Sequence, residues 1–283
     1  EFDTLSDSIN TTVSHLKELT SKEKSRYEDE LRFANSVRQS SLPSIFPAFS
    51  ERKEFGIYAL LNSHEETGRN FYDFHLAPDD KLVFLMADIT GSDIVTVVFM
   101  MSLRSILNTM TGNGMSAAQA FTEANRILLE KSDYAELFIS ASAWMGILDI
   151  KTGDLSYVNA GYRNPVLIRS DGSELTDDRP ELMICSKEDC VYKGGEFKLM
   201  PGDMVFLCSD GVLETVNAKG EYYGQERLFS CLDELTSKDL KDPKAECEAV
   251  CEGVSRDIAA YTEPGKKPGE ITIMCVKYAG VNE

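Results

Sequence analysis

The sequence predicts an α+β protein with two stacked antiparallel β-sheets and pairs of helices on their outer faces. Short apolar runs are joined by turn residues, as in KTGD at 151–154 and SDGS at 170–173, which indicates β-hairpins. Apolar residues recur at helical spacing in two neighbouring pairs of segments. Strands grouped in hairpins, with helices inserted in pairs, favour sheet-on-sheet layers. The four helical segments are expected at 93–110, 116–131, 224–235 and 243–261.

Composition limits the classes of protein to consider. The chain has 283 residues, of which 42% are hydrophobic and 27% charged, as in a soluble globular protein with a substantial core. Its formal net charge of -18 repels phosphate backbones and anionic lipid headgroups, which excludes broad nucleic-acid binding. No uninterrupted apolar run approaches the roughly 20 residues that span a bilayer, and no signal peptide is present. Because the chain opens on Glu1 rather than Met, we expect it to be a fragment of a longer protein.

The cysteines predict a reducing compartment. There are seven, an odd number, and none forms a CxxC pair. Cys208 and Cys275 lie in apolar runs typical of buried strands, and Cys247 and Cys251 are four apart on an expected helix. We therefore expect free buried thiols rather than disulfides or a zinc site.

Residues 1–42 form a distinct N-terminal segment, expected to be a helix that ends before Pro43 and Pro47. Its apolar seam is interrupted after residue 19 and resumes at residue 27, which is typical of a stutter or of a junction between two helical segments. The narrow stripe favours a parallel dimer stalk over a helix that lies on its own domain. The seam residues are Phe2, Leu5, Ile9, Thr12, Leu16 and Leu19, followed by Tyr27, Leu31, Ala34 and Val37.

Two aspartates stand where apolar strands end and turns begin. Asp88 follows FLMA, and Asp210 follows FLCS. Two such carboxylates from different strands could converge on Mg²⁺ or Mn²⁺, which take oxygen ligands. Taken alone, each aspartate is better explained as a turn former, so spacing by itself favours that interpretation over a metal site.

The order of motifs resembles the SpoIIE/RsbU-type branch of the PPM metal-dependent Ser/Thr protein phosphatases. Each motif is weak by itself, but all occur in the family's order along the chain. The matching segments are VRQSSLPS at 37–44, GRNFYD at 68–73, DITGSD at 88–93, NAGYRNP at 159–165, PGDMVFLCSDGVLETVNAKGEYYG at 201–224 and GEIT at 269–272.

The resemblance implies a PPM-type β-sandwich over residues 43–283 that carries two Mn²⁺ or Mg²⁺ ions. In that family the ions activate a bridging water for in-line attack on a phosphoserine or phosphothreonine. Carried over by position, Asp88 and the carbonyl of Ile89 are the expected metal ligands. Asp210 is expected to bridge the ions or to bind the second one.

The chain departs from the family at charged positions. The family's Asp in the GGD motif is Asn70 here, and the two Asp of its DDIT motif are Gly269 and Glu270. Two of the four expected carboxylates are thus absent, at Asn70 and Gly269, and their loss weakens the attraction of the site for divalent ions. Arg69 replaces a glycine and could bind phosphate directly. The possible substitute ligands are Asn70, Asp73, Asp93 and Glu270.

These departures divide the functional prediction. In one reading the domain is a phosphatase in which Asp88 and Asp210 hold one ion together with waters, and the missing ligands are replaced or the activity is weak. In the other it is a pseudophosphatase that keeps the fold and acts as a phosphoprotein-binding or signalling module. A third reading treats the Asp and Gly motifs as ordinary hairpin turns, but the order of the motifs argues against it.

The first residues resemble the last helix of a HAMP signalling module, at Glu1, Phe2, Leu5, Ser8 and Asn10. This resemblance implies a cytoplasmic output domain linked to an upstream membrane-anchored sensor, with a homodimer formed through residues 1–42. By analogy with the family, the expected partner is a phosphorylated anti-sigma-antagonist protein of the STAS type. Neither nucleic acid nor a direct membrane contact is expected.

Overall fold

The computed structural model describes residues 2–62, 68–91, 94–130, 138–170, 172–176, 179–237, 240, 242–263, 265–266 and 268–281, with side chains in the first helix from Thr20 onward. Its centre consists of two stacked five-stranded sheets, in which every strand pairing is antiparallel. The first sheet has the order β1 (Phe55–Asn62), β10 (Ile271–Tyr278), β9 (Met204–Cys208), β6 (Val166–Arg169) and β7 (Gly172–Leu175). The second has the order β2 (Asn70–Ala77), β3 (Lys81–Ile89), β4 (Ala141–Asp149), β5 (Asp154–Ala160) and β8 (Gly195–Lys198).

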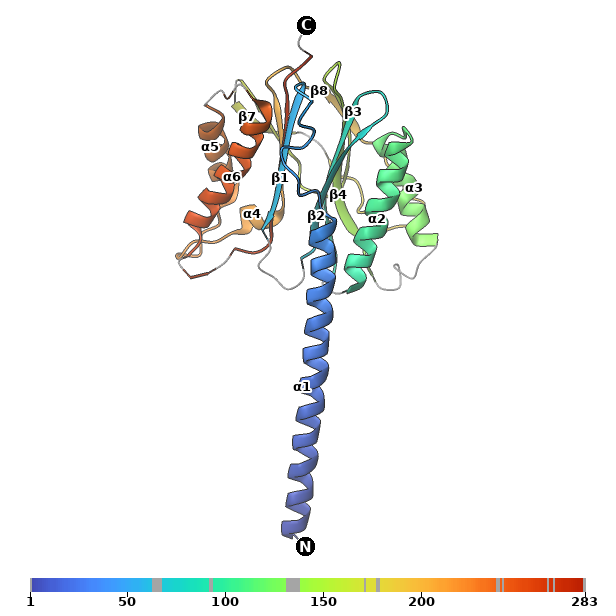
Figure 1. Ribbon diagram of the computed structural model, residues 1–283, viewed down its shortest axis with the longest axis vertical. Coiled ribbons are helices and arrows are strands. Elements are labelled where there is room, and N and C mark those ends of the chain that lie inside the picture. Colours follow the sequence, from blue (N-terminus) through green and yellow to red (C-terminus); the bar gives the residue numbers. More distant parts are fainter. Residues whose placement is uncertain are drawn as a thin grey trace.

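Helix pairs cover the outer faces of both sheets (Figure 1). The second sheet is covered by α2 (Ile94–Gly112) and α3 (Ala117–Glu130). The first sheet is covered by α5 (Gly224–Thr236) and α6 (Pro243–Tyr261). The predicted α+β layers and the four predicted helices are thereby confirmed. The sequence analysis missed the short helix α4 (Asp210–Glu214) and the edge strand β8.

Strand alternation divides the core into two clusters. Along β10, Met274 and Val276 belong to the core shared by the two sheets, whereas Ile273 and Cys275 belong to the cluster beneath α5 and α6. This follows from the two-residue period of a strand, because both faces of β10 are covered. All seven cysteines are free, and Cys247, Cys251 and Cys275 are fully buried, as predicted.

Helix α2 is a long apolar helix that belongs to the core. Its length and apolar composition would allow it to cross a bilayer, with a mean hydropathy of 1.4 over the tested window. It instead lies against α3 and the second sheet, and buries Phe99, Met100, Leu103 and Leu107. A buried core helix explains the same composition.

Helix α1 (Phe2–Ser41) is one unbroken helix that projects from the domain and ends before Pro43, as predicted (Figure 1). Of the two explanations for the interrupted seam, the junction between two helical segments is therefore wrong, whereas the stutter stays a prediction. The change in the apolar pattern instead marks where the helix meets its own domain, since Leu31, Ala34 and Arg38 are buried there. The first part of the seam, Phe2 to Leu19, lies outside the described side chains.

Candidate functional site

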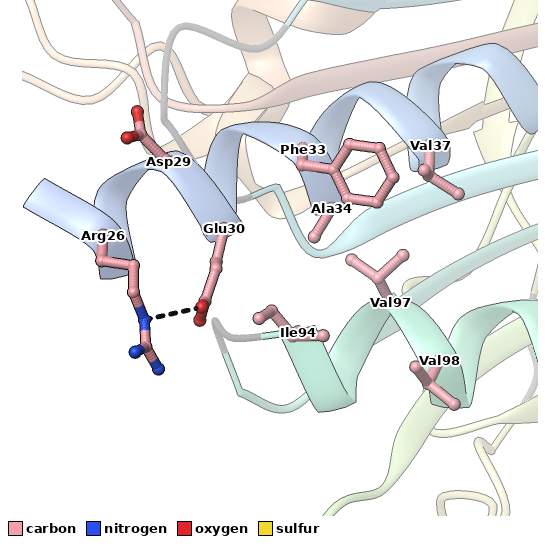
Figure 2. Close-up of a pocket in the computed structure, with 9 residues that line it drawn as sticks. All are labelled: Arg26, Asp29, Glu30, Phe33, Ala34, Val37, Ile94, Val97 and Val98. Atoms are coloured by element: carbon pink, nitrogen blue, oxygen red, sulfur yellow. Dashed lines mark hydrogen bonds and ion pairs between the residues drawn. The ribbon is translucent and has the colours of Figure 1, made fainter.

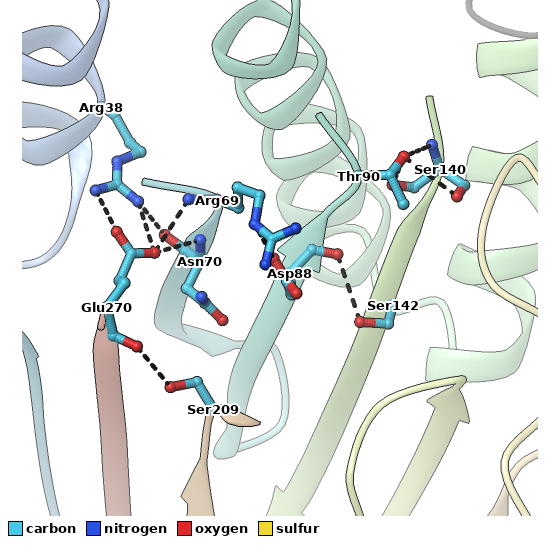
Figure 3. Close-up of polar contacts among 9 residues, drawn as sticks. All are labelled: Arg38, Arg69, Asn70, Asp88, Thr90, Ser140, Ser142, Ser209 and Glu270. Atoms are coloured by element: carbon cyan, nitrogen blue, oxygen red, sulfur yellow. Dashed lines mark hydrogen bonds and ion pairs between the residues drawn. The ribbon is translucent and has the colours of Figure 1, made fainter. Parts of the chain in front are cut away.

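Side chains that are far apart in sequence meet at one rim of the stacked sheets (Figure 3). Asn70 begins β2 and pairs directly across the strands with Asp88, near the end of β3. In the other sheet, Asp210 follows β9 and Glu270 precedes β10, and these two strands are antiparallel neighbours. Asp210 and Glu270 lie close enough to Asp88 that their charges raise its pKa.

Ser209 ties the two strand ends of the first sheet together. Its Oγ accepts a hydrogen bond from the Thr272 amide at 3.0 Å and donates one to the Glu270 carbonyl at 3.3 Å. This fixes the chain on either side of Asp210 and Glu270. The rim is therefore formed by backbone held in both sheets rather than by free loops.

Among the carboxylates of the site, Asp88 has the negative charge that is least balanced by neighbouring groups. Burial raises its pKa above the usual range, the nearby Arg69 guanidinium lowers it, and the charges of Glu270 and Asp210 raise it further. Arg69 approaches only to 3.8 Å, between its Nε and Asp88 Oδ1. Asp88 Oδ1 and Asn70 Oδ1 are both buried and have no hydrogen-bond partner among the described residues.

Asp210 lies at the mouth of the site and is paired with an arginine. Arg163 donates from Nε and Nη2 to Asp210 Oδ1, at 2.9 and 2.6 Å. The pair is partly solvated, with 35% of the Arg163 side chain and 61% of the Asp210 side chain exposed. Such a pair contributes little to stability and can be exchanged for another ligand.

Glu270 is held by a buried arginine from α1. Arg38 donates to Glu270 Oε1 at 3.1 Å and Oε2 at 2.8 Å, and also to the Asn70 carbonyl at 2.7 Å. Glu270 Oε1 additionally accepts the backbone amides of Arg69 and Asn70, at 3.1 and 2.6 Å. The Glu270 carboxylate thus positions the backbone that leads into β2, and it is already compensated by a full positive charge.

Tyr162 carries another unpartnered buried group near the site. Its hydroxyl is buried with no hydrogen-bond partner among the described residues. Burial raises the Tyr162 pKa well above its ordinary value, and the charges of Asp88 and Asp210 raise it further, whereas Arg163 lowers it. The hydroxyl therefore stays protonated and lies among these three charged groups.

The remaining predicted ligands are Ile89, Asp93 and Asp73, and the structure bears on each of them differently. Ile89 is buried and its amide donates to the Arg69 carbonyl at 3.2 Å, but its role as a carbonyl ligand stays a prediction. Asp93 lies outside the described residues. Asp73 is not a substitute ligand, because it is paired with Arg104 at 2.6 Å on the α2 side of β2. It is three positions along the strand from Asn70, an odd number, so strand alternation turns it to the opposite face.

The residues present fit one divalent cation better than the two that the resemblance implies. The unpartnered oxygens of Asp88 and Asn70 are the ligand type that Mg²⁺ or Mn²⁺ takes. For a second ion, Gly269 offers no side chain and Glu270 is engaged with Arg38. Among the described residues, no three His, Cys, Asp or Glu side chains are grouped so as to hold a metal. Asp88, Asn70 and Asp210 are thus the residues that would hold a single ion.

Two arginines of the site were missed in the sequence. Arg38 is 232 residues from Glu270, and Arg163 is 47 residues from Asp210. Nothing in a single sequence pairs groups at such separations. The sequence did offer one signal, namely that Asn70 and Gly269 stand where the family has Asp. A site with fewer carboxylates has less negative charge for metal ions to neutralise.

The chain is similar to a family model, to curated proteins and to solved structures. Residues 78–279 match the family model described as Stage II sporulation protein E (SpoIIE). Among curated proteins, Protein IcfG of Synechocystis is 22% identical over 227 residues, which cover 72% of this chain and 35% of that protein. Phosphoserine phosphatase RsbU of Bacillus subtilis is 22% identical over 194 residues, covering 68% and 56%. The chain thus spans between about a third and somewhat over half of these relatives.

Solved structures share the fold. The SiaA-PP2C domain of Pseudomonas aeruginosa superposes with a TM-score of 0.70 at 20% identity, covering 90% of this chain and 98% of that one. The PP2C phosphatase domain of SpoIIE from Bacillus subtilis, with a fragment of its regulatory domain, gives 0.62 at 15% identity, covering 79% and 63%. The RsbU and RsbW domains of a Mycobacterium tuberculosis protein give 0.66 at 18% identity, covering 81% and 62%.

Proposed function

The chain belongs to the SpoIIE family of PPM-type phosphatase domains, and from this membership we propose that it is a catalytically degenerate member. In this proposal the domain binds phosphorylated serine or threonine on a regulatory protein at the rim described above. It hydrolyses the phosphate ester weakly or not at all. The partner we propose, by analogy with the family, is a small protein of the STAS type.

One observation carries this proposal: the acidic group left in the family's DDIT motif is neutralised by the protein itself. Glu270 is bound by the buried Arg38 and by two backbone amides, and the neighbouring Gly269 has no side chain. A carboxylate that already has a cation and hydrogen bonds gains little by binding a divalent ion. The DDIT motif therefore offers no free carboxylate to a two-ion site.

A second candidate function is a working Mn²⁺- or Mg²⁺-dependent phosphatase, and a specific observation favours it. The buried oxygens of Asp88 and Asn70 have no hydrogen-bond partner among the described residues, and a cation would satisfy both. When bound, such an ion supplies Lewis-acid activation of water for attack on a phosphate ester. The chain's own part would be to hold the phosphoryl group with Arg69 and Arg163 beside that ion.

Restoring the missing carboxylates distinguishes the two candidates. We expect the double variant Asn70→Asp and Gly269→Asp to gain Mn²⁺-dependent hydrolysis of a chromogenic phosphate ester, by at least about tenfold over the wild type. A side chain at 269 has room, since a Cβ there meets nothing within 4 Å. The measurement is the initial rate at several Mn²⁺ concentrations.

The control is Asp88→Asn in the double-variant background, which should abolish the gain. The degenerate-site proposal is rejected in favour of the active phosphatase if the wild type already turns over substrate at the rate of the double variant. Loss of that wild-type activity in Asp88→Asn alone would then identify the ion site. An unchanged, negligible rate in the double variant would show that the lost carboxylates are not what limits activity.

We also propose that the domain works as a homodimer through residues 1–42, as a cytoplasmic output linked to a membrane-anchored sensor. An apolar hollow of about 410 Å³ lies between α1 and α2 (Figure 2). Phe33 is 70% exposed beside it. The lining residues from the two helices include Phe33, Ala34, Val37, Ile94, Val97 and Val98. An exposed aromatic beside an apolar hollow supports contact with a second copy.

The dimer has a direct test by light scattering. Phe33→Asp is expected to shift the protein toward the monomer, because a charge would be buried in the apolar contact. The matched control is Ile45→Asp, which changes a side chain that is 85% exposed and lies outside α1. A monomeric wild type, or a dimer that Phe33→Asp leaves intact, would contradict this arrangement.

A further inference from the structure

The arginines at the mouth of the site present more donors than their carboxylate partners use. Arg163 contacts Asp210 with Nε and one terminal nitrogen, so the remaining N–H groups of its planar fork are available. Arg69 is 52% exposed and only 3.8 Å from Asp88, a contact too long for a hydrogen bond. No other partner of either guanidinium is found in the part of the chain that the structure describes.

A buried donor lies close to Arg163. The Tyr162 hydroxyl has no hydrogen-bond partner among the described residues, and the charges of Asp88, Asp210 and Arg163 act on it. A buried hydroxyl with nothing to bind needs a ligand or an ordered water. The site therefore offers a neutral O–H donor in addition to the two guanidinium groups.

This set of groups matches a phosphate monoester better than a monovalent acid. A phosphate monoester carries about -1.5 to -2 charges near neutral pH and three strong acceptor oxygens. Guanidinium groups bind such oxygens through paired, charge-assisted hydrogen bonds. The exposed Asp210 can turn into water as the phosphate takes its place on Arg163, since a solvated ion pair is easily separated.

We propose that Arg163 and Arg69, together with the buried Tyr162 hydroxyl, form a phosphomonoester-binding site that works without any divalent cation. In this site two guanidinium groups take over the charge-balancing task that metal ions perform elsewhere in the family. The inference rests on the proposed function and adds the groups that hold the phosphoryl oxygens. It also explains why the chain can lose metal-binding carboxylates and still bind its phosphorylated partner.

The test is calorimetric titration of the full chain with a short peptide carrying one phosphoserine, in excess EDTA. We expect binding that the unphosphorylated peptide does not show and that weakens as salt is raised. Arg163→Gln and Arg69→Gln should each weaken it by at least about tenfold. Arg163→Lys should also weaken it, because lysine cannot offer the paired geometry.

The matched control is Arg169→Gln at the far end of the first sheet. Arg169 is 36% exposed and paired at 3.0 Å with Glu174, which is 61% exposed, as in the Arg163–Asp210 pair, and it also lies 3.5 Å from the largely buried Asp203. This variant should bind the phosphopeptide as the wild type does. Thermal melting of every variant checks that the fold is retained.

Each other outcome has a defined meaning. Wild-type affinity in Arg163→Gln and Arg69→Gln overturns the inference. Binding that requires Mn²⁺ also overturns it, but leaves the metal-dependent phosphatase standing. Failure to bind the phosphopeptide with or without Mn²⁺ overturns this inference and the proposed phosphoprotein recognition together.

Discussion

Replacing Arg38 with methionine is expected to lower the free energy of unfolding by about 3–5 kcal/mol, because it leaves a buried carboxylate without its cation. Only 1% of the Arg38 side chain and 6% of the Glu270 side chain are exposed. The change also removes the donor to the Asn70 carbonyl at 2.7 Å. Urea denaturation followed by circular dichroism measures the effect.

A solvated arginine on the same helix provides the control for Arg38. Arg32 is 2.7 Å from Asp29, and both side chains are more than half exposed. Arg32→Met should therefore change the free energy of unfolding by no more than about 0.5 kcal/mol. If Arg38→Met were equally mild, the buried ion pair would not be holding α1 to the rim of the sheets.

Substituting Gly56 by alanine is expected to destabilise the domain by about 3 kcal/mol, at the upper end of overpacking. A Cβ at this position in β1 would stand 2.2 Å from the Pro243 carbonyl oxygen and 2.7 Å from the Lys244 nitrogen. These are backbone atoms at the start of α6, so no side chain can rotate out of the way. Strand and helix would have to separate.

The comparison variant for this glycine is Gly112→Ala. Gly112 ends α2, and a Cβ there meets nothing within 4 Å. Alanine should be neutral or stabilising by about 0.4–1 kcal/mol, because it reduces the freedom of the unfolded chain. Thermal melting of both variants is the measurement, and a Gly56→Ala protein that melts with the wild type would contradict the close approach of β1 and α6.

The fold was largely predictable because its signals are local. Turn residues delimit the hairpin β4–β5 at 151–154, and apolar periodicity marks α2 and α3. Strand β8 has a polar sequence and pairs on one side only, so it gives no such signal. Helix α4 is a few residues long and is specified by its place after β9 rather than by its own pattern.

The site was predictable only in part. The order of the motifs predicted that Asp88 and Asp210 converge, and the structure places their charges close enough to interact. Strand alternation could already have removed Asp73 from the possible ligands. The arginines could not be found, because Arg38 and Arg163 reach the site through contacts across the fold that no local pattern encodes.

The pairing of Glu270 with Arg38 affects how far the domain depends on the supply of metal ions. A domain whose acidic groups are neutralised by bound divalent ions depends on the supply of those ions. Here the counter-charge for Glu270 is encoded in the polypeptide and arrives with folding itself. Magnesium or manganese starvation would therefore leave the pair of Glu270 and Arg38 unchanged.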